Sequence, residues 1–213
     1  MNFETFIKSA SKIKNLNLPG EDSQFKMSPP FREELIEANR AKMKNAKQAG
    51  VMALFYPNHE GETYLILILR KTYKGVHSAQ VGFPGGKYEE DDLDLEYTAL
   101  RETYEEVGVP MAAINILKPM TKIYIPPSNF TVSPYVGISH KTPVFVKQDD
   151  EVEGLIEVRL SDFLDDTNAT DVNVMTSLEK EMEVPAFILN DHVVWGATAM
   201  MLSELKDLIK RVL

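Results

Sequence analysis

Apolar positions along the chain follow helical spacing in some segments and strand spacing in others, which predicts a protein of mixed α and β structure. Near-helical spacing within residues 2–14 predicts a short helix that ends before the Leu18-Pro19-Gly20 turn. Residues 31–47 contain no internal Gly or Pro and predict a mostly exposed helix that ends by Gly50. A single apolar stripe within residues 196–213 predicts a C-terminal helix that packs on the sheet.

Short apolar runs rich in β-branched and aromatic residues predict the strands. Val51–Tyr56 and Thr63–Leu69 flank the turn residues Pro57–Gly61 and so predict a β-hairpin. Because the second run is apolar almost throughout, we expect it to be buried on both faces, within a sheet that helices cover on both sides. Further strands are predicted over 117–125, 131–138 and 155–160, followed by a helical turn over 161–164.

We expect one α+β domain preceded by a helical extension. The 213 residues contain no internal repeat, low-complexity tract or linker that would divide them. The predicted extension covers residues 1–48 and the predicted domain residues 49–213. With 44% hydrophobic residues, a chain of this length buries a core without disulfides or a structural metal.

Composition and charge exclude several classes of function. Zero cysteines exclude disulfide frameworks, thiolate zinc sites and cysteine nucleophiles. The apolar runs are far shorter than the roughly 20 residues of a membrane span, and the charged N-terminus lacks the apolar core of a secretory signal, so we expect a cytoplasmic protein. A net charge of −9 disfavours nucleic acid and anionic membranes as partners. A polyphosphate substrate would therefore need basic side chains or divalent cations to bind.

The candidate chemistry follows the Phe83-Pro84-Gly85-Gly86 loop. Acidic residues fill most of positions 89–94, and a helix is predicted over Leu93–Val109, with Asp92 or Asp94 as its N-cap and Gly108 at its end. Helical spacing places Tyr97, Leu100, Tyr104 and Val107 on one face of this helix. It places Glu102, Glu105 and Glu106 together on roughly the opposite face.

Three carboxylates on one helix face favour a divalent cation. Like charges three and four residues apart cost a helix a few tenths of a kcal/mol per pair, and a cation removes that cost. Hard carboxylate oxygens suit Mg²⁺ or Mn²⁺, and magnesium commonly bridges carboxylates to substrate phosphates. On any other helix this spacing would usually be a solvated acidic face, but the Gly-Gly loop and the acidic run beside it favour a metal site.

These residues resemble the signature of the Nudix hydrolases, GX5EX7REUXEEXGU, in which U is a bulky apolar residue. The residues that match it in register are Gly86, Arg101, Glu102, Glu105, Glu106, Gly108 and Val109. The interval between Gly86 and Arg101 holds one residue more than the signature, Asp92 stands where the signature has a glutamate, and Thr103 replaces a bulky apolar residue.

The likeness is more specific to the coenzyme A pyrophosphatase branch of that family. The branch commonly shows the same one-residue extension and an aspartate at the position of Asp92. It differs in having an arginine at the position of Gly75 and a glycine at that of Ala79. The segments similar to this branch are 67–70, 77–86, 98–103, 124–130, 134–137, 151–152 and 195–199.

The resemblance implies a Nudix hydrolase domain with the Nudix fold, a mixed β-sheet in an α/β/α sandwich. It also implies metal ligation by Glu102, Glu105 and Glu106, with the Gly86 carbonyl as a further ligand, and a catalytic role for Glu105. Arg101 would brace the loop acids as a structural ion pair.

Roles outside this cluster stay open between function and plain structure. Glu151, just before a predicted strand, is the candidate general base or a solvated loop charge. Arg70 would bind substrate phosphate or form a surface ion pair, and His77 would contact substrate or cap a turn. Glu89 and Asp92 would support the site or be solvated. Trp195 and the Met200-Met201 pair are expected in the core.

By resemblance, the expected activity is Mg²⁺- or Mn²⁺-dependent hydrolysis of the diphosphate of coenzyme A or its thioesters, giving 3′,5′-ADP and (acyl-)4′-phosphopantetheine. The alternatives are hydrolysis of another nucleoside diphosphate derivative, such as an oxidised nucleotide or ADP-ribose, and a catalytically silent domain that senses a nucleotide. The expected partner is in each case a small nucleotide, with homodimerisation left open.

Overall fold

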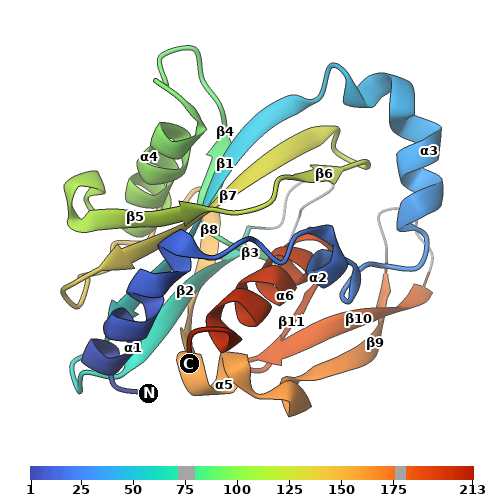
Figure 1. Ribbon diagram of the computed structural model, residues 1–213. Coiled ribbons are helices and arrows are strands. Elements are labelled where there is room, and N and C mark those ends of the chain that lie inside the picture. The colour runs from blue at the N-terminus through green and yellow to red at the C-terminus, as the bar shows by residue number, and fades with distance from the viewer. Residues whose placement is uncertain (72–79, 176–180) are drawn as a thin grey trace.

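A computed structural model describes residues 1–71, 80–175 and 181–213 of the chain (Figure 1). The helices are α1 Phe3–Ala10, α2 Glu21–Phe25, α3 Arg32–Met43, α4 Leu95–Val107, α5 Leu160–Leu164 and α6 Gly196–Lys210. One mixed sheet contains β1 Lys47–Pro57, β2 Thr63–Arg70, β3 Val81–Gly82, β4 Gly85–Lys87, β5 Ile114–Pro119, β6 Ile123–Ile125, β7 Phe130–Ser139 and β8 Val152–Arg159. A small antiparallel sheet contains β9 Ala169–Met175, β10 Glu181–Leu189 and β11 His192–Trp195.

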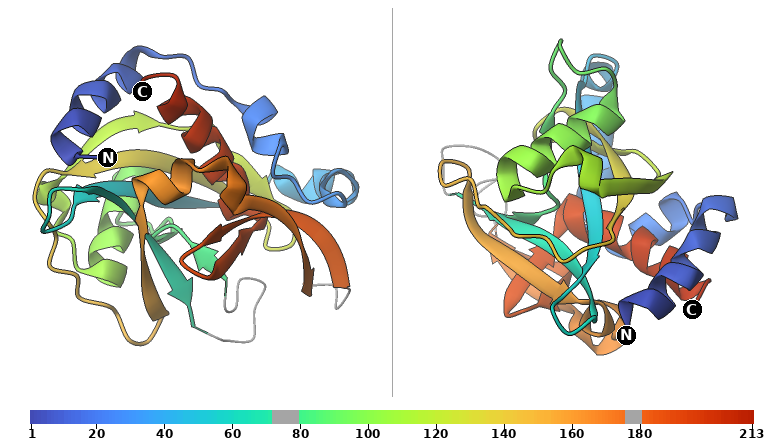
Figure 2. Two further views of the ribbon diagram at one scale, coloured as in Figure 1. Left: turned by 90° about the horizontal axis from the view of Figure 1, so that it is seen from below. Right: turned by 90° about the vertical axis from the view of Figure 1, so that its left-hand side faces the viewer.

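Strand β1 is the centre of the mixed sheet. It pairs in parallel with β7 and in antiparallel fashion with both β2 and β4. The main path runs β3-β2-β1-β7-β5, while β6 also pairs with β7 and β8 with β2. Helices α1 and α6 lie on one side of this sheet and α4 on the other (Figure 2). The predicted α+β class and the mixed sheet between helices are therefore confirmed.

Side chains of β1 and β2 alternate between two buried layers. On β1, Met52 and Leu54 pack toward α4, while Ala53 and Phe55 pack toward α1 and α6. The predicted hairpin is confirmed, since Tyr56 of β1 is paired with Tyr64 of β2. Burial on both faces explains why these strands are nearly continuous apolar runs.

Of the N-terminal helices, α1 packs on the sheet and α2 packs on α6. Phe6 of α1 is fully buried with its ring centroid 5.0 Å from that of Phe55. The buried carboxylate of Glu204 on α6 accepts hydrogen bonds from Gln24 of α2 at 2.9 Å and from Thr121 at 2.7 Å. The predicted helix near the N-terminus is confirmed. Helix α2 was not predicted from the sequence, and it is hydrogen-bonded to α6 through Gln24 and Glu204.

Residues 44–50 differ from their prediction. Helix α3 ends at Met43 and β1 begins at Lys47, so Gly50 lies inside a strand and does not end a helix. The parallel pairing of β1 with β7, from Lys47 opposite Phe130 onward, overrides the helical composition of this stretch. Gly50 has a packing role, because a Cβ there would lie 2.2 Å from the Leu95 carbonyl oxygen of α4.

Two further stretches were assigned incompletely from the sequence. The predicted strand over 117–125 is two strands, β5 and β6, which pair with different parts of β7. Strands β9 to β11 were not predicted, since β9 is exposed along most of its length and carries little apolar pattern. None of the helices in the described ranges has the length and apolar content to cross a membrane.

Gly50→Ala should lower the free energy of unfolding by roughly 1–3 kcal/mol, because its methyl group would meet the α4 backbone, which cannot turn aside as a side chain can. Gly154→Ala in β8 is the matched control. A Cβ there lies 3.9 Å from the Leu69 Cβ, an ordinary contact, so stability should change by less than about 1 kcal/mol. Urea denaturation measures both variants, and equal stability of the two would contradict this account of Gly50.

Candidate active site

Helix α4 is held at both ends by the residues that its sequence predicts. The Asp94 side chain accepts a hydrogen bond from the Tyr97 amide at 2.8 Å, and Gly108 ends the helix with φ of 78°. The predicted faces are wrong in part. Tyr104 is 54% exposed, whereas Glu106 is buried against the sheet. Small residues such as Ala99 face β1, so the helix lies close to the strand and turns Glu106 inward.

Strand β4 runs between β1 and the carboxylates of α4. Gly86 is paired with Gly50, and a Cβ on Gly86 would lie 2.4 Å from the carboxyl carbon of Glu102. The Gly85 amide donates to Glu106 Oε2 at 2.7 Å. Glycine at position 86 therefore leaves room for the Glu102 carboxylate, whereas glycine at position 85, with φ of 150°, lets β4 lie close to Gly50 and Val51 of β1.

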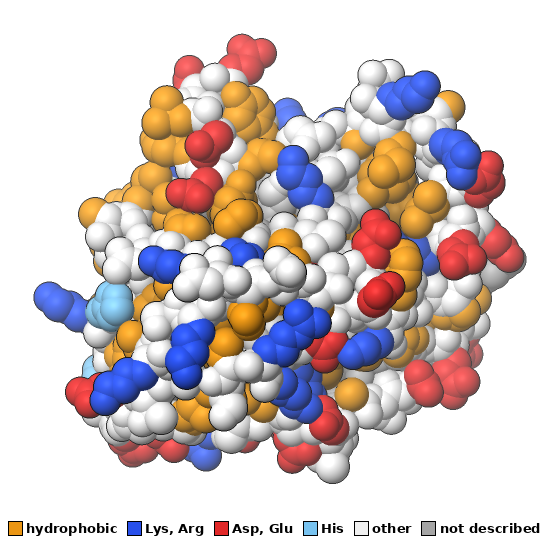
Figure 3. Space-filling view, in the orientation of Figure 1, with side chains coloured by type: hydrophobic (Ala, Val, Ile, Leu, Met, Phe, Trp, Pro, Cys, Tyr) orange, Lys and Arg blue, Asp and Glu red, His pale blue; other side chains and the backbone are white. Residues whose placement is uncertain are grey.

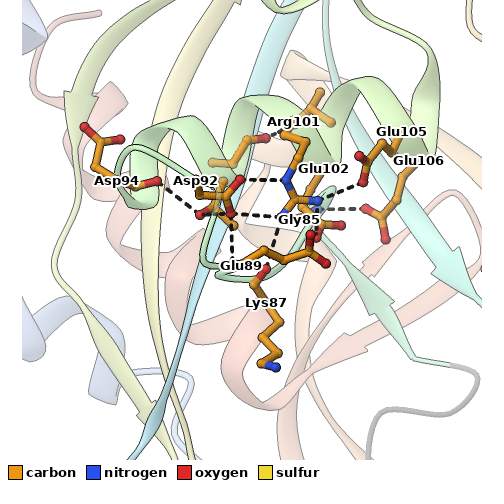
Figure 4. A network of polar contacts seen from close by, with 12 residues as sticks. Gly85, Lys87, Glu89, Asp92, Asp94, Arg101, Glu102, Glu105 and Glu106 are labelled. Carbon is orange, nitrogen blue, oxygen red and sulfur yellow. Dashed lines mark hydrogen bonds and ion pairs between the residues drawn. The ribbon is translucent and has the colours of Figure 1, made fainter.

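Arg101 connects the acidic loop with the acidic helix (Figure 4). Its guanidinium donates to both carboxylate oxygens of Asp92, at 2.8 and 3.0 Å. It also donates to Glu102 at 3.0 Å and Glu105 at 2.9 Å. The Arg101 guanidinium, together with other hydrogen bonds, holds the pKa of Asp92 well below its usual range. The Glu89 side chain is exposed, and this residue joins the network through its amide, which donates to Asp92 at 3.0 Å.

Glu106 is the most unusual carboxylate of the cluster. It is 2% exposed, and this burial raises its pKa to about 7, although Arg70 and the Gly85 amide act in the opposite direction. Its Oε1 accepts no hydrogen bond among the described residues. Burial also raises the pKa of Glu102, whose side chain is 13% exposed. The Glu105 side chain is half exposed. Two of the three helix carboxylates therefore lie where a negative charge is poorly solvated.

Arg70 lies at the same cluster. It donates to the Gly85 carbonyl at 2.5 Å and lies 3.4 Å from Glu106 Oε1. Glu151 is close enough for its charge to raise the pKa of both Glu102 and Glu106. His77, the other predicted substrate-binding residue, lies outside the described residues, as do Gly75 and Ala79.

A cavity of about 460 Å³ opens beside these residues. Arg70, Gly86, Glu102 and Glu151 line its polar end. The apolar lining comes from segments far apart in the sequence, and its residues include Phe31, Leu35, Ile125, Pro126, Pro127, Phe130, Trp195 and Met201. Figure 3 shows the surface hollowed between the lobe of the β4–α4 loop and the lobe of α3.

Sequence reasoning missed part of this cavity. Trp195 was expected in the core but is partly exposed and lines the cavity. Met200 and Met201 are buried in the core as expected, and Met201 also lines the cavity. Phe31 and Leu35 were missed altogether. The signal that could have found them is an apolar pair at helical spacing in an otherwise polar helix.

The donor set fits a divalent cation in its chemistry. In the described ranges, no three acidic or histidine side chains are already grouped as a metal site. Arg101 instead engages Glu102 and Glu105. The Oε1 of Glu106, which accepts no hydrogen bond among the described residues, and the mutual repulsion of Glu102, Glu106 and Glu151 are nevertheless features that a cation would stabilise.

Comparison with known proteins identifies relatives. The family model described as NUDIX domain matches residues 46–179. An uncharacterized Nudix hydrolase, NudL of Yersinia pestis (strain Pestoides F), is 31% identical over 144 residues, which cover 68% of this chain and 71% of the relative.

Solved structures of low sequence identity share the fold. RenU, a Nudix hydrolase from M. smegmatis, superposes with a TM-score of 0.53 at 12% identity, covering 79% of this chain and 88% of its own. A MutT/nudix family protein from Enterococcus faecalis gives a TM-score of 0.51 at 16% identity, covering 84% and 74%.

In metal-free buffer, Glu106→Gln should stabilise the fold increasingly as the pH rises from about 4.5 to about 7. Because the folded-state pKa is raised, the unfolded chain ionises first over this window, and its ionisation favours unfolding of the natural protein. The full shift corresponds to roughly 3 kcal/mol. Urea denaturation with EDTA at pH 4.5, 6 and 7.5 measures the difference in unfolding free energy between the variant and the natural protein. A difference that does not change with pH would contradict a raised pKa of Glu106 in the folded state.

Proposed function

The chain belongs to the Nudix family and is a Nudix hydrolase acting on nucleoside diphosphate derivatives; within that class we propose that it cleaves the diphosphate of coenzyme A or its thioesters, with Mg²⁺ or Mn²⁺ as cofactor. The products are 3′,5′-ADP and 4′-phosphopantetheine or its acyl form. Residues 49–213 are the hydrolase domain of this proposal, and residues 1–48 its helical extension.

One observation carries the choice of coenzyme A. The segments that resemble the coenzyme A branch are far apart in sequence, yet parts of them line a single cavity together with the carboxylates. These parts are Gln80–Phe83, Ile125–Pro127 with Phe130, and Trp195–Thr198. Because residues outside the acidic helix determine selectivity, their convergence at one cavity supports a substrate shared with that branch.

In this proposal the acidic helix holds the cation and the strand ends hold the substrate. Glu102, Glu105 and Glu106, with the Gly86 carbonyl, are the metal ligands. A bound divalent cation supplies charge neutralisation on the phosphoryl oxygens. Binding of a cation at this cluster requires Glu102 and Glu105 to exchange at least part of their contact with Arg101 for the metal.

The remaining roles belong to groups beside the helix. Glu151 is the general base that takes a proton from water as the water oxygen attacks phosphorus and the anhydride P–O bond breaks. Arg70, which faces the same cluster, lies where its guanidinium can meet the diphosphate oxygens. Arg101 and Asp92 position the helix carboxylates.

Purified protein with Mg²⁺ or Mn²⁺ should convert coenzyme A to 3′,5′-ADP and 4′-phosphopantetheine, as detected by mass spectrometry. EDTA should abolish the reaction, because an acidic cluster cannot accept a diphosphate without a bridging cation. Preferential hydrolysis of ADP-ribose or an oxidised nucleotide would favour the first alternative. Nucleotide binding without turnover of any diphosphate would favour the silent sensor.

Glu105→Gln and Glu106→Gln should each lower kcat by at least about 100-fold, since each removes a charged ligand from a group that acts as a unit. Glu96→Gln, in the first turn of the same helix, is the control and should retain activity. Circular dichroism melts should show all three variants folded. Natural rates in both ligand variants would refute the assigned roles.

A further inference from the structure

Arg32, in the first turn of α3, lies at the apolar end of the cavity. Among the residues that the structure describes, the other charged side chains lining the cavity are those of Arg70, Lys87, Glu102 and Glu151, which belong to the acidic cluster or to β4 beside it. Arg32 instead has Phe31, Leu35 and the Pro126-Pro127 turn as fellow lining residues. Arg32 is therefore the one cation that the described residues place in this mostly apolar wall.

The guanidinium of Arg32 is poorly satisfied by the protein. Its Nη2 donates to the Tyr124 carbonyl at 2.7 Å, which uses one of the five N–H donors of an arginine. Its Nε is buried without a hydrogen-bond partner among the described residues. Burial lowers the pKa of Arg32, and the negative charge of Glu21 offsets this only in part.

No described carboxylate lies within ion-pair distance of Arg32, which distinguishes it from the other cavity arginine. Arg70 lies 3.4 Å from the carboxylate of Glu106. On α3 itself, Arg40 is exposed and forms an ion pair with Glu37 at 2.8 Å. A partly buried arginine without an acidic partner, on the wall of a substrate-sized cavity, is suited to receive an anion from a ligand.

We propose that Arg32 binds the phosphate monoester on the nucleoside half of the substrate, away from the diphosphate that is cleaved. This inference rests on the proposed function, in which the substrate carries a 3′-phosphate on its adenosine. Adenosine 3′-phosphate matches both features of this end of the cavity: the flat aromatic face of adenine suits the wall of Phe31, Pro126 and Phe130, and the phosphate dianion suits the guanidinium.

The placement of Arg70 supports separate binding sites for the two phosphate groups, with Arg70 at the diphosphate and Arg32 at the 3′-phosphate. Its guanidinium is engaged with the Gly85 carbonyl and Glu106, at the acidic cluster where the diphosphate binds. It is therefore not free to serve a second phosphate at the far end. Since α3 lies before residue 46, where the match to the family model begins, recognition of the distal phosphate would come from outside the common domain.

The test compares coenzyme A with dephospho-coenzyme A in Arg32→Gln and in Arg40→Gln. Arg32→Gln should raise KM for coenzyme A about tenfold or more, the loss expected for charge-assisted hydrogen bonds, with kcat within about twofold. KM for dephospho-coenzyme A should stay nearly constant. Arg40→Gln, which removes an exposed charge from the same helix, should change neither KM. An equal rise of KM for both substrates would overturn the proposal.

A binding measurement separates this proposal from the proposed function. With Mg²⁺ present, calorimetric titration with 3′,5′-ADP and with 5′-AMP measures the effect of the 3′-phosphate on affinity without turnover, because neither nucleotide contains a phosphoanhydride bond. If the protein does not cleave coenzyme A but Arg32→Gln weakens 3′,5′-ADP about tenfold and 5′-AMP hardly at all, the anion site stands and the proposed function fails. If Arg32→Gln weakens both nucleotides equally or neither, the anion site is refuted.

Arg32→Lys is a second variant for the case in which Arg32→Gln destabilises the fold, since Arg32→Gln removes the hydrogen bond from the guanidinium to the Tyr124 carbonyl. Lysine keeps the charge but not the planar fork, so its preference for 3′,5′-ADP over 5′-AMP should lie between those of the natural protein and Arg32→Gln. If Arg32→Gln melts early, Arg32→Lys decides alone: an unchanged preference overturns the proposal, and a reduced one supports it.

Discussion

The close approach of α4 to β1 and β4 is the constraint on which the rest of the structure depends. At Gly50 the helix backbone comes so near the strand that even a methyl group would not fit, and at Gly86 the Glu102 carboxylate occupies the space of a side chain. This contact makes the acidic helix part of the core rather than a surface element. The carboxylates gain fixed positions as a result, and they lose much of their hydration.

Burying like charges beside one another costs free energy, and the surroundings limit that cost in two ways. Arg101 neutralises the outer part of the cluster through Asp92, Glu102 and Glu105, while the Gly85 amide supports the inner carboxylate of Glu106. One oxygen of Glu106 is left without a hydrogen bond among the described residues. The protein alone leaves the carboxylates of this cluster with incomplete hydrogen bonding. Such an arrangement is expected where buried carboxylates serve to bind a cation and do not serve to stabilise the fold.

Much of this fold could be predicted from local pattern, and the exceptions share a physical cause. The helix caps at Asp94 and Gly108 and the β1–β2 hairpin depend on short-range chemistry, so the sequence predicts them directly. Glu106 was assigned to an exposed face because an amphipathic pattern counts a carboxylate as polar, whereas the tertiary contact at Gly50 decides which way it faces. Gly50 itself was misassigned for the same reason, since its close approach to α4 is visible only in three dimensions.

The cavity could be predicted only in part because its two ends are built by different means. Its polar end follows a continuous motif, so Gly86 and Glu102 could be identified by spacing. Its apolar end joins α3, the β6–β7 turn and the start of α6, which are far apart in the sequence and meet only in the folded structure (Figure 1). In the proposed function, the reaction chemistry therefore resides in the compact strand–helix contact of the family domain. The same proposal assigns substrate selection to segments that can vary without disturbing this contact, because neither α3 nor the turn carries the contact at Gly50.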